Sequence, residues 1–542
     1  MPAAYVRHCQ ADREPRVGKD WNRDVDEAGI LLTGTEYKRS LQDGRKVWIF
    51  GEGDVPDLTV HPATAGLVDE YALWYDRHND PAWADKLLID RDDEGGPTPA
   101  GLIVPASSSD LVTMSRSIYA QAFVGAGNVT HTPAYGALIA LGLLDAVSLI
   151  GETDGGRPEV ARAYRNRLEN EGFFLTLTGG AAVLGDRFRP PNEHSALRIV
   201  KETDEGLVVS GRTGMHTSTP FAHDVYVGLQ RPDVNQRVMF SVAVNSPGAR
   251  VVARRPATRY KTRFMSPLSS RYDELDAHLW LENVLVPWQK VFAYRFGQPP
   301  VEEAGERDRI FCWLTWHHQI SYLARADFTL GLALASAEVM GQKENPAVVS
   351  RLVDLMINAQ TIRTCLTAAN LDPKTSGAGY LYPNPLHVAS ATIYTLSVRQ
   401  RMAEILRDIP GSSLVITPTD LDFADPVMEE YLDRSFGGGA FTAEQRAALL
   451  NLIWDHVASG LDGRESAFEM HASGGLALWR NRVQRWFERG NELANGVLHT
   501  LSVEMPPIDV EGLRNIGGIG AGPAPRGNGA APAEPRISGR TG

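Results

Sequence analysis

Cysteine is scarce in this chain of 542 residues, which contains only Cys9, Cys312 and Cys365. These three residues lie too far apart in sequence to form the short ligand spacings of a metal site. An odd number of distant cysteines also argues against a disulfide framework. We therefore expect no structural metal, no disulfide bridges, and a reducing, cytoplasmic compartment.

An excess of basic charge is also missing. The chain has 54 Lys and Arg residues against 66 Asp and Glu residues, which gives a formal net charge of −12. Nucleic acids and anionic membranes attract clustered basic side chains, and the sequence has no such cluster. The N-terminal sequence MPAAYVRHCQADREPR has no apolar run, and no segment is expected to reach the roughly 18 apolar residues of a membrane span. We expect a soluble protein with neither a nucleic-acid nor a membrane partner.

A nucleotide-binding loop is the third absence. The run Gly517–Gly522 (GGIGAG) is glycine-rich like a dinucleotide loop, but no strand pattern precedes it and no helix pattern follows it. It lies in the segment 511–542, which is rich in Gly, Pro, Ala and Arg and is expected to be a disordered tail. The sequence therefore predicts no nicotinamide site in this chain.

The polar N-terminus (1–30) is expected to be flexible. Three regions with different sequence patterns follow it. Residues 31–160 are mostly helical in pattern, and Ser107–Tyr119 and Pro133–Ile150 are the clearest segments. Residues 161–295 contain β-branched and aromatic runs between Gly, Pro and Asn turns. Long segments with helical periodicity fill residues 296–510: 321–340, 347–369, 388–409, 442–459 and 476–501. The order predicts an α+β protein with an N-terminal helical domain, a central β domain and a C-terminal helical bundle.

Two short polar segments stand out, one before the β-rich region and one within it. His131 and Tyr135 are four residues apart around Pro133, which suits the first turn of a helix, so both side chains can reach one pocket. A purely structural histidine is the alternative. The segment Met215–Pro220 (MHTSTP) offers a histidine and hydroxyls that suit either a cofactor ring or a turn cap.

The helical region has its own polar features. Asp462–Glu465 and Ala472–Gly475 contain small residues that predict breaks at which the backbone approaches a ligand, although helix caps would explain them equally well. The adjacent His317 and His318 point to different helix faces, so packing is favoured over metal binding.

The run Ser266–Trp288 (SPLSSRYDELDAHLWLENVLVPW) invites two interpretations, an active site or a connection between two parts of the fold. We favour the connection. Leu279–Val286 would be the last strand of the β domain, and Pro287 would end it because proline lacks the N–H of a ladder. Trp288 would anchor the chain where it enters the bundle.

This run, extended to Arg295, resembles a signature of the 4-hydroxyphenylacetate 3-monooxygenase family, oxygenase component. Leu32–Arg45 (LTGTEYKRSLQDGR) and Lys201–Gly211 (KETDEGLVVSG) are similar to two further family motifs, and the resemblance extends from about residue 32 to 500. It implies an acyl-CoA dehydrogenase-like fold with a helical domain, a β-sandwich or barrel domain and a four-helix bundle. It also implies a homotetramer, or else a homodimer.

The resemblance also implies a reaction. A separate NAD(P)H-dependent flavin reductase would supply reduced FAD, and the oxygenase would react it with O₂ to form a C4a-hydroperoxyflavin. One oxygen atom would then pass to a phenolic substrate, ortho to its hydroxyl. The missing nicotinamide site fits this division of labour, because hydride chemistry would occur on the partner protein.

On the substrate side, Tyr135 matches the active-site tyrosine of the family. His131 stands where the family has arginine, and Leu177 stands where it has a catalytic histidine. A phenol hydroxylase needs a proton acceptor, and His131 is the first candidate and His216 the second. Leu177 would help to keep the substrate pocket dry. These changes predict a substrate other than 4-hydroxyphenylacetate.

The flavin side keeps the family pattern. The residues that the resemblance assigns to FAD are Thr178, Gly179, Asp186, Arg187, Thr217, Arg464, Ser473, Gly474 and Gly475. Next to Arg464, the family has histidine where this chain has Glu465.

Three alternatives stay open. A dehydratase of the same fold uses FAD with an iron–sulfur cluster, which would need clustered cysteines and a histidine. A CoA-ester dehydrogenase would need a carboxylate facing the flavin, and the sequence identifies none. A non-catalytic flavin-binding paralogue is the third.

Overall fold

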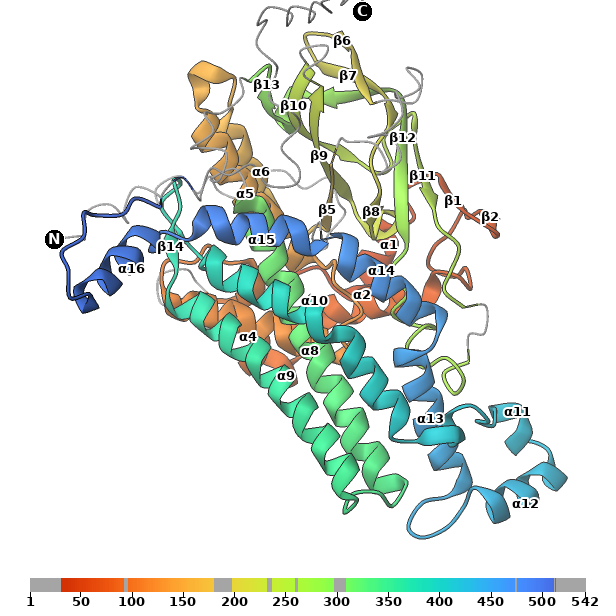
Figure 1. Ribbon diagram of the computed structural model, residues 1–542. Helices are drawn as coiled ribbons and strands as arrows, with labels where there is room; N and C mark the ends of the chain where they lie inside the picture. Colours follow the sequence, from red (N-terminus) through yellow and green to blue (C-terminus); the bar gives the residue numbers. More distant parts are fainter. Residues whose placement is uncertain are drawn as a thin grey trace, which may run out of the picture.

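The computed structural model describes residues 31–91, 96–179, 197–231, 236–258, 262–296, 309–472, 475–510 and 512. The predicted flexible N-terminus, the run Gly517–Gly522 and nearly all of the predicted tail lie outside these residues. So do four of the predicted flavin contacts, Asp186, Arg187, Ser473 and Gly474. In the described part, strands gather at one end and long helices extend away from them (Figure 1).

Six helices form the N-terminal part: α1 (Gly34–Ser40), α2 (Ala65–Asn79), α3 (Ala84–Leu87), α4 (Ser108–Val124), α5 (Pro133–Ile150) and α6 (Pro158–Glu171). The side chain of Ser107 accepts from the Asp110 N–H in a capping box, which fixes the start of α4. Thr132 caps α5 in the same way, and Pro133 occupies its first turn. Both predicted helices are confirmed. A short hairpin, β3 (Leu88–Arg91) with β4 (Gly96–Pro99), lies between α3 and α4.

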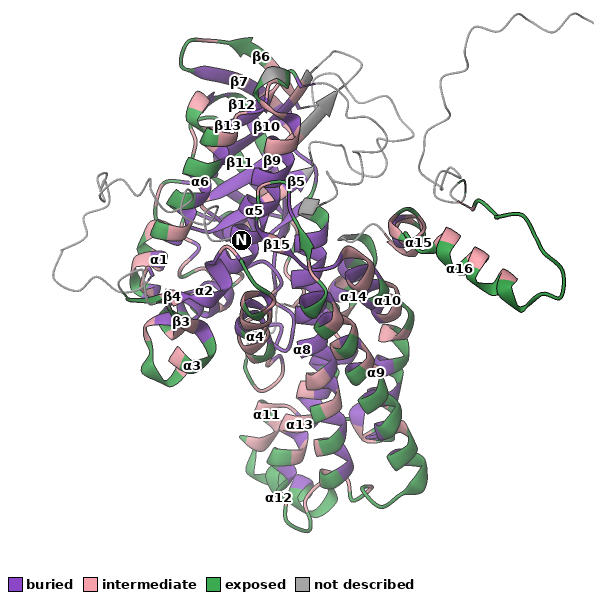
Figure 2. Ribbon diagram, turned by 90° about the vertical axis from the view of Figure 1, so that its left-hand side faces the viewer, coloured by how far each residue is buried: buried purple, intermediate pink, exposed green. Residues whose placement is uncertain are grey.

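Helix α5 is the apolar centre of this part. By length and composition it would suffice to cross a membrane, which the sequence-based expectation had excluded for every segment. However, 89% of its apolar window is buried inside the fold, as in the core helix of a soluble protein (Figure 2). Gly136 allows α5 to approach β5 (Leu175–Gly179) closely, because a Cβ there would lie 2.8 Å from the Leu175 carbonyl oxygen.

Two sheets form the β domain. The larger has the order β2-β1-β11-β12-β7-β6, with β8 paired to β12, and the smaller has the order β13-β10-β9-β5. Their other strands are β1 (Val47–Ile49), β2 (Gly53–Asp54), β6 (Arg198–Glu202), β7 (Gly206–Arg212), β8 (His216–Thr217), β9 (Asp224–Arg231), β10 (Gln236–Ala243), β11 (Ala249–Ala253), β12 (Asp276–Pro287) and β13 (Val291–Tyr294). Strands β1 and β2 lie in the segment that was predicted to be helical. Residues 47–49 form a strand there because they pair in parallel with β11.

The predicted strand of the run Ser266–Trp288 is confirmed as part of β12, which ends at Pro287. It is not the last strand, since β13 follows it. Trp288 does not mark the entry into the bundle either. Its indole N–H donates to the Thr203 carbonyl at 3.1 Å, which anchors it to the turn between β6 and β7.

Long helices form the C-terminal bundle: α8 (Arg309–Val339), α9 (Pro346–Leu371), α10 (Pro385–Asp408) and α13 (Ala443–Val457). Helices α14 (Gly460–Ala472) and α15 (Gly475–Trp486) run between the bundle and the sheets, and the short α11 (Asp420–Phe423) and α12 (Pro426–Ser435) lie at the far end (Figure 1). A small hairpin, β14 (Lys374–Thr375) with β15 (Leu381–Tyr382), joins α9 to α10. The mixed architecture confirms the predicted α+β class.

Two sequence-based details of the bundle are wrong. Residues 476–501 are not one helix, because α15 ends at Trp486 and α16 (Gly490–Gly496) begins after a break at residues 487–489. The predicted break at Asp462–Glu465 lies inside α14. Gly463 is exposed there, so its modest helix-propensity cost is outweighed by the buried neighbours on the other face.

The first part of the run Ser266–Trp288 is clamped between two helices. The peptide N–H groups of Leu268 and Ser269 donate to Asp455 Oδ2 of α13 at 2.8 and 2.7 Å, and the Ser269 hydroxyl donates to Oδ1. On the other side, Gly66 of α2 lies so close that a Cβ would come within 2.0 Å of the Ser270 carbonyl oxygen. The run therefore connects the helical parts to β12, as its favoured interpretation predicts.

We expect Asp455→Ala to lower the free energy of unfolding by about 2–3 kcal/mol, because two buried N–H groups and one hydroxyl would lose a charged acceptor. Urea denaturation followed by tryptophan fluorescence measures the change. Asp433→Ala, on the exposed surface of α12, is the matched control. Equal midpoints for the two variants would contradict this role of Asp455.

Candidate functional site

His131 and Tyr135 meet at the start of α5, and their ring centroids are 4.4 Å apart. His131 is not in the first turn but directly precedes the cap residue Thr132. Its backbone is fixed at both polar atoms, because its N–H donates to Glu274 Oε1 at 2.7 Å and its carbonyl accepts from the Tyr71 hydroxyl at 2.9 Å. Both side chains are buried and their rings pack against each other, so they lie together as their spacing predicts.

The adjacent histidines of α8 complete a cage around this pair. The rings of Tyr135 and His318 stack at 5.2 Å with an interplanar angle of 12°, and His317 meets the Tyr135 ring edge-on at 5.3 Å. Phe468 of α14 lies 5.7 Å from both His131 and His318. We call the five residues His131, Tyr135, His317, His318 and Phe468 the imidazole–aromatic cage.

Burial determines the charge of the cage. It lowers the pKa of His317 to about 3 and that of His318 well below its ordinary value, so both rings are neutral at physiological pH. Nδ1 of His317 and Nε2 of His318 find no hydrogen-bond partner within the described part of the chain. The two histidines do pack in the interior, as the sequence suggested, but they pack against the candidate site.

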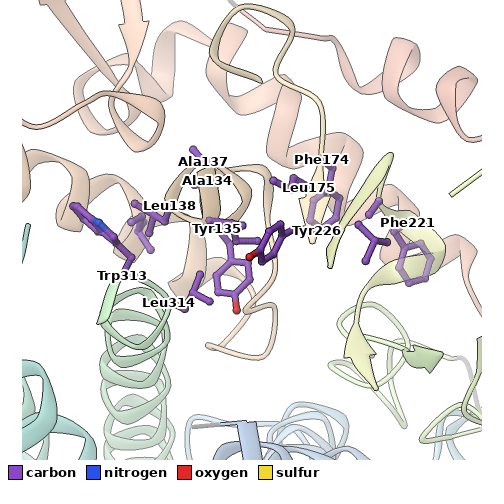
Figure 3. Close-up of a cluster of buried hydrophobic side chains, with 14 of the residues drawn as sticks. Ala134, Tyr135, Ala137, Leu138, Phe174, Leu175, Phe221, Tyr226, Trp313 and Leu314 are labelled. Carbon is purple, nitrogen blue, oxygen red and sulfur yellow. The ribbon is translucent and has the colours of Figure 1, made fainter. Parts of the chain in front are cut away.

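Apolar side chains surround Tyr135 on two sides. Figure 3 shows Trp313 and Leu314 near the start of α8 on one side of it. On the other side it shows Leu175 and Tyr226 of the smaller sheet and Phe174, which directly precedes β5. All of these side chains are buried. The cage is therefore closed off by apolar surface on these two sides.

Glu274, in the segment just before β12, holds the chain next to the cage through hydrogen bonds to its carboxylate. Its carboxylate accepts from the Thr130 N–H at 3.0 Å, the Thr130 hydroxyl at 2.9 Å and the Ser218 hydroxyl at 3.3 Å, besides the His131 N–H. Burial alone would raise the pKa of Glu274, but the hydrogen bonds and charge of His131, together with the charge of Arg464, outweigh burial and lower it. Glu274 is therefore a buried, ionised carboxylate.

Arg464 of α14 joins the cage to the larger sheet. Its guanidinium binds Asp276 through two hydrogen bonds, Nη2 to Oδ1 at 2.6 Å and Nε to Oδ2 at 2.9 Å, and its carbon lies 4.4 Å from the Phe468 ring centroid. Nη2 also donates to Thr217 Oγ1 at 3.4 Å. Burial would lower the pKa of Arg464, but Asp276 and Glu465 raise it, so it stays a cation.

Strand β5 carries the other predicted contacts. Leu175, which faces α5, shares its side of the strand with Leu177, whereas Thr176 and Thr178 point the other way. The Thr176 hydroxyl donates to the Thr217 carbonyl at 2.9 Å, and the Thr178 hydroxyl donates to the Gly214 carbonyl at 3.3 Å. Thr178 therefore lies on the same side as Thr217, and half-buried Leu177 lies on the side of α5.

His216 of β8 is held at both ring nitrogens. Nε2 contacts the Thr213 hydroxyl at 3.0 Å, and Nδ1 contacts the Thr219 hydroxyl. Burial and neighbouring imidazoles lower its pKa to about 3. This ring has no free nitrogen for a substrate proton, so its geometry favours a structural role over the predicted second base.

Glu465 is buried beside Arg464, whose Nη1 lies 2.6 Å from its Oε1, while its Oε2 has no partner among the described residues. Burial raises its pKa to about 7, against the lowering effect of Arg464 and Arg325. This carboxyl group can therefore change its charge near neutral pH.

The structure brings together His131, Tyr135, Thr217 and Arg464, with Thr178 next to the same loop. Gly179 ends β5, and Gly475 begins α15 with a left-handed φ of 79°. No group of three potential metal ligands occurs among the described residues. Sequence reasoning missed Thr130, Glu274, His317, His318 and Phe468. A single buried acid or histidine leaves no periodic signal, although Glu274 lies in the run Ser266–Trp288, for which an active site was one of the two interpretations.

Comparison with known proteins gives two family matches. Residues 33–293 match the model described as 4-hydroxyphenylacetate 3-hydroxylase N terminal, and residues 305–495 match the model of its C terminal. Among curated proteins, the 4-nitrophenol 4-monooxygenase/4-nitrocatechol 2-monooxygenase oxygenase component of Rhodococcus opacus is 30% identical, covering 81% of this chain and 85% of the relative. The 4-hydroxyphenylacetate 3-monooxygenase oxygenase component of Escherichia coli is 27% identical, covering 82% and 86%.

Solved structures share the fold. The oxygenase component of 4-hydroxyphenylacetate 3-monooxygenase complexed with FAD superimposes with a TM-score of 0.78 at 24% identity, covering 86% of this chain and 98% of that one. An archaeal 4-hydroxybutyryl-CoA dehydratase from N. maritimus gives 0.76 at 19% identity, covering 90% and 99%. The acyl-CoA dehydrogenase-like fold is thereby confirmed, whereas fold similarity alone does not separate the two activities.

We expect Glu465→Gln to change how stability depends on pH. The folded protein holds the Glu465 proton up to about pH 7, against an ordinary pKa of 4.5, so wild-type stability falls as pH rises through this window. The variant lacks this loss, and its free energy of unfolding relative to wild type should rise by about 3 kcal/mol across the window.

Urea denaturation of both proteins from about pH 4.5 to pH 8 measures this difference, since other titrating groups contribute equally to both. Glu444→Gln on the exposed face of α13 is the control, which should follow the wild-type curve. A Glu465→Gln curve parallel to wild type over the whole range would contradict the raised pKa.

Proposed function

This chain belongs to the 4-hydroxyphenylacetate 3-hydroxylase family, and we propose on that basis that it is the oxygenase component of a two-component monooxygenase. It would use FAD, reduced by a separate NAD(P)H-dependent reductase, and O₂ to hydroxylate a phenolic ring ortho to its hydroxyl. Its relatives are named as oxygenase components that act on hydroxyphenylacetate and nitrophenols, which supports this class of reaction. The flavin–oxygen intermediate expected from the sequence, the homotetramer and the cytoplasmic location stay predictions.

The residues at the site fit a flavin. Thr178 and Thr217 provide hydroxyls, and Arg464 provides a buried guanidinium within reach of Thr217. Nearby, Tyr322 Oη and Glu465 Oε2 have no hydrogen-bond partner within the part of the chain that the structure describes, and buried polar atoms ordinarily have partners. Reduced FAD bound here would supply the electrons that activate O₂ for transfer to the ring.

The imidazole–aromatic cage is the observation that carries the substrate proposal. It is buried, lined by flat rings and neutral at His317 and His318, which suits a phenolic ring and excludes water. His131 can accept the proton of the phenol hydroxyl, and the resulting phenolate is the more electron-rich ring. Tyr135 and His318 would position that ring by stacking.

The charges at the site favour a phenol other than 4-hydroxyphenylacetate. Arg464 is the cation closest to the cage on α14, and Asp276, Glu465 and Glu274 already neutralise it. A substrate carboxylate would therefore find no free cation among the described cage residues. Neutral phenols, such as a nitrophenol or a larger phenolic metabolite, match the cage better.

The other reactions of this fold receive less support from the described residues. A CoA-ester dehydrogenase would need a carboxylate free to remove a proton from its substrate, but Glu274 accepts four hydrogen bonds. The carboxyl group of Glu465 has an unpartnered oxygen among the described residues, but its other oxygen is paired with Arg464 at 2.6 Å. The family match likewise favours oxygenation over dehydration.

The decisive experiment supplies the purified protein with FAD, a flavin reductase, NADH and a panel of phenols under ¹⁸O₂. Mass spectrometry should detect one labelled oxygen atom in at least one product. Reduced-FAD consumption without oxygen insertion into any phenol would overturn the proposal and favour a non-catalytic flavin-binding protein.

We expect His131→Gln to reduce the rate of hydroxylation by about 100-fold or more, because a general base contributes this much or more to proton transfer. Product formation with the best substrate of the panel measures the effect. His78→Gln is the matched control, because His78 is equally buried but bonds only the Trp74 carbonyl outside the cage. A His131→Gln rate equal to that of the control would contradict the assignment of the base.

A further inference from the structure

We propose that Thr130 and Glu274 are positioning residues that fix the tautomer of His131, so that its Nε2 faces the substrate as a proton acceptor. This inference rests on the proposed function for its role in catalysis, but the tautomer itself follows from the geometry. Neither residue stands among those that the family resemblance assigns to the site.

The hydrogen bonds around Thr130 determine the direction of each proton. The Thr130 hydroxyl lies 2.9 Å from Glu274 Oε2 and 3.0 Å from His131 Nδ1, but it has a single proton to donate. The carboxylate is the stronger acceptor, because a hydrogen bond to an ionised group is stronger than one to a neutral ring nitrogen. The hydroxyl therefore donates to Glu274 and must accept from His131.

The consequence for the imidazole is direct. A neutral His131 keeps its proton on Nδ1 and presents the lone pair of Nε2. The Glu274 carboxylate also lies 3.6 Å from Nδ1, so it stabilises the positive charge that the ring gains when Nε2 accepts a proton. Rotation of the ring is limited because it packs against the rings of Tyr135, His318 and Phe468. The hydrogen bonds of the His131 N–H and carbonyl fix its backbone.

Other groups facing His131 do not reverse this arrangement. The imidazoles of His317 and His318 are neutral because burial lowers their pKa, and so is His216 on β8. Tyr71 and Tyr135 stay protonated because burial raises their pKa. Among the described Arg and Lys side chains, Arg464 lies next to Glu274, at 3.6 Å from Oε2, and it is itself paired with Asp276.

The proton step balances without a further reactant. The O–H bond of the phenol breaks, an N–H bond forms at Nε2, and the electron pair stays on the phenolate oxygen. His131 becomes an imidazolium whose Nδ1 proton remains in its hydrogen bond to Thr130. No group is oxidised or reduced in this step.

The test begins with the tautomer. Magic-angle-spinning NMR of the full-length protein labelled with ¹⁵N-histidine reports which ring nitrogen carries the proton. The signal of His131, one of 14 histidines, is identified by its loss in His131→Gln. We expect the Nδ1–H form in wild type and a mixture of both forms in Thr130→Val, which keeps the shape of the side chain but removes the hydroxyl. An Nε2–H signal in wild type would overturn the proposal, whatever the enzyme does to phenols.

The kinetic arm tests the positioning role. Thr130→Val should lower kcat/KM for hydroxylation about tenfold, the equivalent of one lost hydrogen bond, and Thr130→Ser should restore most of the rate. Thr329→Val is the matched control, because the Thr329 hydroxyl also contacts a buried imidazole, that of His456 at 2.8 Å, but lies outside the cage.

The outcomes separate the two proposals. An unchanged kcat/KM in folded Thr130→Val would refute the positioning role while leaving the proposed function intact. Failure of wild type to insert oxygen into any phenol would refute the proposed function, and the NMR result would still decide the tautomer. Thermal unfolding shows whether Thr130→Val is folded, and Thr130→Ser provides the second variant if it is not.

Discussion

The buried carboxylate of Glu274 is the interaction on which the site depends. It accepts hydrogen bonds from the segment before α5 and from Ser218 after β8, and it faces Arg464 of α14, so it connects all three parts of the fold. An ionised group in the interior is tolerated only with several such partners, because its desolvation is costly. The orientation of the first turn of α5, and with it that of His131 and Tyr135, follows from this one anchor.

Burial also explains why a pocket with so many imidazoles is not highly charged. The interior disfavours the charged form of the His216, His317 and His318 rings, so none of them adds a cation. His317 and His318 contribute ring contacts with Tyr135 instead. Positive charge is concentrated in Arg464, where acidic neighbours balance it. The result is a polar but nearly neutral environment around the cage, which suits the proposed loss of a proton by a phenol.

Much of the architecture was accessible from the sequence, because its determinants are local. Caps such as Ser107 and Thr132 and the periodicity of α9 and α10 identify helices, and the alternation in β7 and β10 identifies strands. The pairing of His131 with Tyr135 was also accessible through their spacing. The cage as a whole was not, because His317, His318 and Glu274 reach it through tertiary packing. Similarly, Gly463 predicted a break within α14, but the buried contacts of its neighbours keep the helix continuous.

The pairing of β1 with β11 constrains the order of events during synthesis. Val47, near the start of the described chain, pairs in parallel with Val251, deep in the β domain, while the other edge of β1 pairs with the adjacent β2. A nascent chain that has emerged as far as α6 must therefore hold an unpaired strand edge in solution until β11 follows. Such long-range pairing slows folding and exposes aggregation-prone surface, so protection by chaperones would matter most during this interval on the ribosome.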